Sequence, residues 1–191
     1  MLILIIGLVL FLGIHSSKML FPGFRGNVIA SRGLNAWKGI YSLVSFAGLI
    51  LIIWGYALYR PDAPDLWIPP VWTRHIALLL MAFAFIILVS SNLPTGRIKQ
   101  AVKHPMLLSV KIWALAHLLA NGDLASIILF GSFLAWAVWD RIAAKRRGDP
   151  LPVAGSSLIP DVLSVVIGLA LYVVFVLWAH QWLFGVAPVV M

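Results

Sequence analysis

The chain has 191 residues, of which 62% are hydrophobic and only 10% are charged, and its mean hydropathy is +1.03. Soluble domains carry about 25% charged residues, so this composition excludes an ordinary soluble globule and predicts a single integral membrane domain over residues 1–191, with the lipid bilayer as its solvent. The net charge of +8 does not indicate nucleic-acid binding, because there is no soluble face to present it. The absence of cysteine excludes disulfides and thiolate metal sites.

Apolar segments separated by Gly, Pro, Asn and Asp predict an all-α, polytopic membrane bundle of six transmembrane helices. The predicted spans cover residues 2–20, 39–59, 72–93, 106–120, 124–139 and 162–184. The fourth and fifth spans are short, and only Asn121, Gly122 and Asp123 separate them. We expect a tight helical hairpin there, and the sequence leaves open whether its tip reaches the outer surface.

The Lys and Arg residues predict the orientation. Twelve of them flank the first, third and fifth connections, and only Arg60 and Arg74 lie in the second. Because cytoplasmic loops carry an excess of Lys and Arg, we expect the three basic connections in the cytoplasm and both termini outside. The twelve are Lys18, Arg25, Arg32, Lys38, Arg97, Lys99, Lys103, Lys111, Arg141, Lys145, Arg146 and Arg147.

Histidines inside apolar segments are the candidate functional residues. Ionisable groups at membrane depth are costly and tend to mark functional sites. His15 follows an almost unbroken apolar run and precedes Ser16 and Ser17. It is either a hydrogen-bonded histidine at the interface or a ligand of a metal or haem, since neutral imidazole is the commonest such ligand.

His117 lies in a stripe with Trp113 and Asn121 at a spacing of four residues. That stripe suits a flat ring system lying against the helix, although an ordinary core histidine remains an alternative. His104 precedes Pro105 and marks the start of a helix. His75 and His180 are expected at the outer interface. The depths of the histidines in the membrane, estimated from the predicted spans, leave two alternative ligand pairs open, His75 with His117 and His15 with His104.

Four motifs resemble the NnrU family of bacterial membrane proteins. They are WKGIYSLVS at 37–45, KHPMLL at 103–108, WALAHLLANG at 113–122 and FLAWAVWDR at 133–141. The resemblance extends from the first span through the connection after the fifth span. It implies a bacterial inner-membrane protein with a role in nitric oxide reduction and denitrification.

The NnrU family is also similar to the plastid 15-cis-zeta-carotene isomerase, which uses haem b. The isomerase carries its haem ligands in a His-Ser pair and in a Trp-x-x-x-His stretch after a His-Pro pair, and these motifs match His15 and His117, with Trp113 beside the latter. A cysteine of the isomerase is replaced here by Ala114. The resemblance therefore implies haem b on His15 and His117. It leaves three functions open: a nitrogen-oxide factor, a haem-dependent isomerase of a membrane polyene, and a cofactor-free assembly factor for a membrane reductase.

Overall fold

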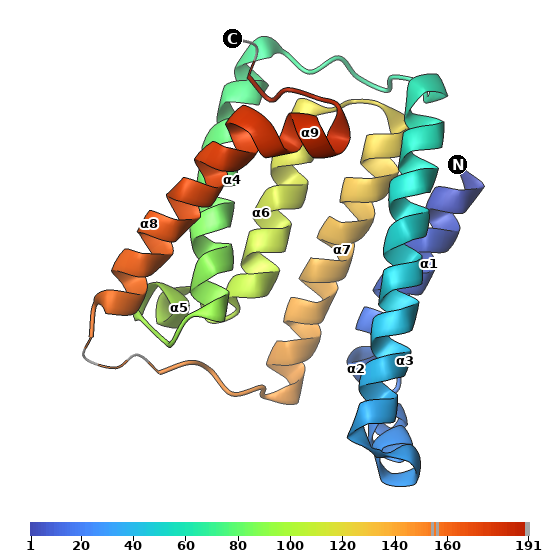
Figure 1. Ribbon diagram of the computed structural model, residues 1–191, viewed down its shortest axis with the longest axis vertical. Coiled ribbons are helices and arrows are strands. Elements are labelled where there is room, and N and C mark those ends of the chain that lie inside the picture. The colour runs from blue at the N-terminus through green and yellow to red at the C-terminus, as the bar shows by residue number, and fades with distance from the viewer. Residues whose placement is uncertain (154, 156, 190–191) are drawn as a thin grey trace. The chain divides into compact units, whose positions relative to one another are not determined.

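The described part of the chain is helical. The computed structural model describes residues 1–153, 155 and 157–189, and Figure 1 shows its ribbon. Among these residues the β-structure is limited to one isolated antiparallel bridge between Asp65 and Asp123. The prediction of an all-α chain is confirmed. The elements are α1 (Leu2–His15), α2 (Ser17–Leu20), α3 (Pro22–Tyr59), η1 (Arg60–Asp62), α4 (Val71–Asn92), α5 (Arg97–Val102), α6 (Pro105–Ala120), α7 (Leu124–Arg147), α8 (Ile159–Val174), η2 (Phe175–Ala179) and α9 (His180–Phe184).

Within the described residues, four helical segments, not the predicted six, are long and apolar enough to cross a membrane. They are Gly23–Asp62, Val71–Asn92, Leu124–Arg147 and Ile159–Phe184. α1 has 14 residues and α6 has 16. At 1.5 Å per residue these two helices are about 21 and 24 Å long, against a hydrocarbon core of about 30 Å.

The first predicted span is shorter than expected. It ends at His15, where Ser16 separates α1 from α2 and donates its backbone N–H to the carbonyls of Leu12 and Gly13. The residues expected to form a turn after this span are helical instead. α3 begins at Pro22, and proline is tolerated at the first position of a helix. The helical direction changes at Gly33, whose φ of 83° is open to glycine at little cost. α3 therefore begins well before residue 39, the predicted start of the second span.

The remaining spans agree more closely with prediction. α4 and α6 begin and end within one residue of the predicted bounds. α7 extends to Arg147, so four basic residues expected in a loop lie on the last turns of a helix. The sixth span contains a π-helical segment, η2, which the sequence did not predict.

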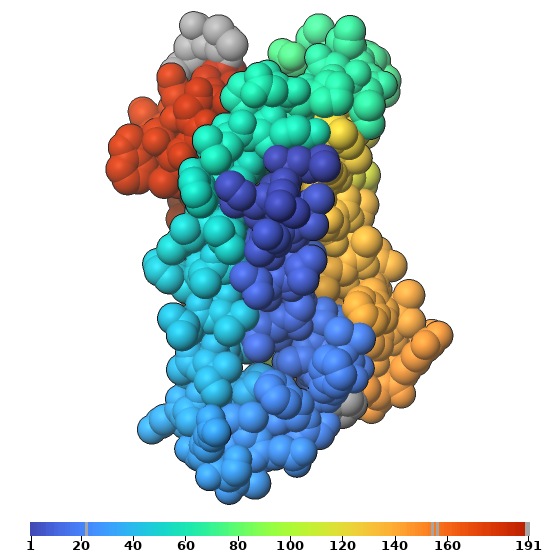
Figure 2. Space-filling model, turned by 90° about the vertical axis from the view of Figure 1, so that its right-hand side faces the viewer, coloured from blue at the N-terminus to red at the C-terminus, as the bar shows by residue number. Residues whose placement is uncertain are grey.

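The contacts of the chain group into two compact units, and each is described by itself. The first comprises Met1–Ile68 and Asn121–Ala143. In it α1 packs on α3, and Figure 2 shows α1 lying between α3 and α7. The close approach of α1 to α3 depends on Gly48, since a Cβ built there would meet the backbone nitrogen of Phe11 at 2.7 Å.

The second unit comprises Pro69–Ala120 and Ala144–Met191. Its helix α4 packs against both α6 and α8 (Figure 1). Phe85 of α4 lies against the rings of Tyr172 and Phe175, with centroids 6.2 and 5.2 Å away. At the other end of α8 the carboxylate of Asp161 accepts the backbone N–H groups of Arg97 and Ile98, both at 2.9 Å, and so caps the short helix α5.

Candidate functional site

His15 is the last residue of α1 and lies in the first unit. Its Nδ1 is 2.7 Å from the carbonyl oxygen of Phe11, one turn earlier. A carbonyl only accepts hydrogen bonds, so Nδ1 carries the proton and, in the neutral ring, the lone pair resides on Nε2. This is the tautomer that binds a metal through Nε2, with the other nitrogen held by a backbone carbonyl.

Aromatic rings surround the imidazole of His15. Phe11 stacks on it with centroids 4.2 Å apart, Tyr41 of α3 lies 5.1 Å away, and Trp136 of α7 meets it edge-on at 6.1 Å. One turn beyond Tyr41, the buried hydroxyl oxygen of Ser45 has no hydrogen-bond partner among the described residues. Three helices thus build a mostly apolar, aromatic environment around one imidazole.

His117 lies on α6 in the second unit and has the same tautomer. Its Nδ1 is 2.8 Å from the carbonyl oxygen of Trp113, and the two rings lie 5.3 Å apart. The predicted neighbourhood of Trp113 and His117 is confirmed. Asn121, the third member of the predicted stripe, accepts a hydrogen bond from Arg60 at 3.2 Å and belongs to the first unit.

A third imidazole, which is predicted at the outer interface, lies beside His117. His180 is the first residue of α9, and its ring centroid is 6.4 Å from that of His117 with the planes at 22°. Its Nδ1 is 2.7 Å from the carbonyl oxygen of Val186, so its proton is also on Nδ1.

The other two histidines are in different positions. His75 is exposed in the first turns of α4. The carbonyl of His104 accepts the N–H of Leu108 at the start of α6, which confirms the predicted helix boundary. His104 precedes His117 by thirteen positions, about 20 Å along a helix, so these two cannot share one metal.

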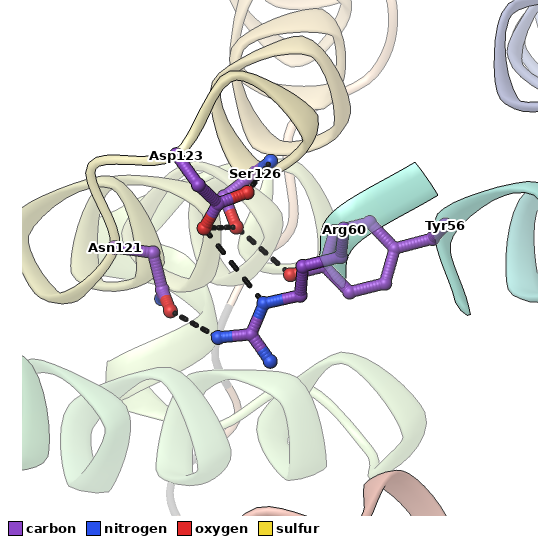
Figure 3. A network of polar contacts seen from close by, with 5 residues as sticks. All are labelled: Tyr56, Arg60, Asn121, Asp123 and Ser126. Atoms are coloured by element: carbon purple, nitrogen blue, oxygen red, sulfur yellow. Dashed lines mark hydrogen bonds and ion pairs between the residues drawn. The ribbon is translucent and has the colours of Figure 1, made fainter. Parts of the chain in front are cut away.

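A polar network joins the end of α3 to the start of α7 in the first unit, and sequence analysis missed it (Figure 3). The carboxylate of Asp123 accepts the backbone N–H of Ser126 at 2.8 Å and its hydroxyl at 2.7 Å, which caps α7. Because the Ser126 hydroxyl has one hydrogen, the Tyr56 hydroxyl must be the donor in their 2.8 Å contact. Arg60 lies 3.7 Å from Asp123 and also donates to Asn121.

Backbone hydrogen bonds reinforce this junction. The N–H of Leu66 donates to the carbonyl of Gly122 at 2.9 Å, and the N–H of Leu124 donates to the carbonyl of Pro64 at 3.0 Å. The turn between α6 and α7 is thus fixed to the segment that follows α3. Each side chain of the network has a polar partner within it, and these contacts hold the end of α3 to the start of α7.

The candidate ligands are imidazoles, which can bind a metal ion or a haem iron. No group of three or more His, Asp or Glu side chains within the described ranges could hold a metal ion. A haem iron takes four nitrogens from its macrocycle and needs only one or two protein ligands, for which a histidine suffices. His15 and His117 each fit that requirement in tautomer and surroundings.

The fold and site define an all-helical protein with membrane-length apolar helices and oriented imidazoles among aromatic rings. The family model described as NnrU protein matches residues 3–188, and the chain belongs to the NnrU family. Comparison with curated proteins gave no match, and comparison with solved structures gave none either.

Proposed function

We propose that this chain binds haem b in the cytoplasmic membrane of a bacterium and acts in nitrogen-oxide metabolism. His117 supplies one iron ligand. When bound, haem b contributes an iron that exchanges single electrons and binds nitric oxide. A membrane reductase is the partner class that this role implies.

One observation carries the proposal. Both histidines implied by the resemblance donate Nδ1–H to a carbonyl four residues earlier, at 2.7 and 2.8 Å. Outer hydrogen bonds of this kind fix ring orientation and raise the basicity of a metal-binding imidazole. An aromatic ring beside each imidazole supplies the apolar surface that a flat macrocycle needs.

We further propose that α1 and α6 cross the bilayer despite their length. Backbone hydrogen bonds join the turn after α6 to residues 64–66. These residues lead into α4, so α6 ends near the point where α4 begins. It therefore runs back along α4, against which it packs. A short span is accommodated by local thinning of the bilayer at modest cost. The chain then has six crossings, with both termini outside.

The haem content of the purified protein tests the proposal. Wild-type protein, His117→Ala and His75→Ala are expressed with haem precursor and purified in the same detergent. Haem is expected in the wild type and in the His75→Ala control, because His75 is exposed at the start of α4, and it is expected to be largely lost from His117→Ala. Equal haem in all three proteins contradicts ligation by His117.

The response to nitric oxide tests the proposed role in nitrogen-oxide metabolism. Addition of nitric oxide to the reduced protein is expected to shift its Soret band, and deletion of the gene is expected to slow nitric oxide consumption by cells. A haem-free protein whose deletion still lowers reductase activity identifies an assembly factor instead.

A further inference from the structure

The two imidazoles of the second unit, His117 and His180, have the separation of a metal-ligand pair. Two imidazoles on opposite sides of one metal ion, each with a metal–nitrogen bond of about 2.0–2.1 Å, have ring centres about 6 Å apart. The observed separation is 6.4 Å and the planes are within 22° of parallel. Rings in direct face contact are closer, as Phe11 and His15 are at 4.2 Å.

Both rings have the protonation state that such a pair needs. Each Nδ1 bonds to a backbone carbonyl, Trp113 for His117 and Val186 for His180, at 2.8 and 2.7 Å. The lone pair of each neutral ring is therefore on Nε2. Two neutral rings in this state cannot donate an Nε2 proton to each other, whereas an electron-accepting metal can bind both.

The backbone around His180 is built to orient its ring. The π-helical segment η2 immediately precedes it, and such segments occur frequently at functional sites. α9 ends after five residues at Gly185, whose left-handed φ of 71° turns the chain so that the carbonyl of Val186 meets the ring of His180. Figure 1 shows α9 turning away from the line of α8.

We infer that His180, together with His117, would hold the iron of the proposed haem. This inference rests on the haem proposed above and assigns its second position to an imidazole of the same unit in place of His15. The site takes a haem rather than a bare ion, because the described residues offer two imidazoles here and no group of three or more His, Asp or Glu ligands.

The spin state of the ferric haem tests this assignment. Two imidazole ligands give a low-spin iron, so electron paramagnetic resonance of the wild type is expected to show a low-spin signal. His180→Ala is expected to become high-spin and to return to low-spin when free imidazole is added, a rescue that a purely structural role of His180 does not produce. His180→Met, which keeps a side chain able to bind iron, is expected to remain low-spin with a raised reduction potential.

His75→Ala is the matched control, because His75 is exposed at the start of α4, and it is expected to keep the low-spin signal. A His180→Ala protein that stays low-spin while His15→Ala becomes high-spin overturns the assignment and leaves the haem intact. A high-spin wild type also overturns it. A wild type without haem overturns the proposed function, and the inference with it.

Discussion

The indole N–H of Trp136 donates to the hydroxyl oxygen of Ser16 at 3.1 Å, although 120 positions separate the two residues. This bond joins α7 to the break between α1 and α2. It lies next to His15, whose ring meets Trp136 edge-on. Trp136 of α7 thus bonds to the residue that follows His15 and also contacts the His15 ring.

Trp136→Phe is expected to destabilise the protein by about 1 kcal/mol, since it removes this bond and keeps a large ring. Ser16→Ala also loses the bond from Ser16 to the carbonyl of Leu12, so a double-mutant cycle is needed. Unfolding in mixed detergent should show a coupling energy of about 0.6 kcal/mol or more. Additive effects of the two substitutions contradict the bond.

Gly48 permits α1 to approach α3. A Cβ at this position meets the backbone nitrogen of Phe11 at 2.7 Å, so Gly48→Ala is expected to push the helices apart and to lower the melting temperature. The control is Gly13→Ala, because a Cβ there meets nothing within 4 Å and alanine favours helix. Equal melting temperatures for the two variants contradict the helix crossing described for the first unit.

Asp123 has two roles that substitution can separate. Asp123→Ala removes the cap of α7 and the contact with Arg60, at an expected cost of about 1–2 kcal/mol. Asp123→Asn keeps a capping oxygen and is expected to cost less. Arg60→Ala is expected to have the smallest effect, because its ion pair is 3.7 Å long and its side chain is 36% exposed. Chemical denaturation of the three variants gives the order, and a larger effect for Arg60→Ala than for Asp123→Ala contradicts it.

The absence of cysteine allows a direct test of topology. Leu66→Cys, at a position 61% exposed after α3, is expected to react with a membrane-impermeant maleimide in intact cells. Gln100→Cys, exposed in the basic connection on α5, is expected to react only after permeabilisation. Labelling of both in intact cells contradicts the proposed orientation of α4.

The sequence was sufficient to predict the helical class, the bounds of α4 and α6, and the neighbourhood of Trp113 and His117, because these features depend on local spacing and apolar length. The place of His180 depends on a π-helical segment and on the turn at Gly185, neither of which has a signal in residue spacing. The contact of Arg60 with Asp123 likewise depends on how α3 packs near the start of α7. Apolar length alone also placed the end of the first span too late, because the helix breaks at Ser16.

Binding of haem b by histidine can be measured in the reduced-minus-oxidised absorption spectrum of the purified wild-type protein. We expect a Soret band and resolved visible bands on reduction, with a pyridine adduct typical of haem b. A featureless spectrum from folded protein, produced in cells supplied with haem precursor, would show that no haem is bound. The oriented imidazoles of His15, His117 and His180 would then be structural residues.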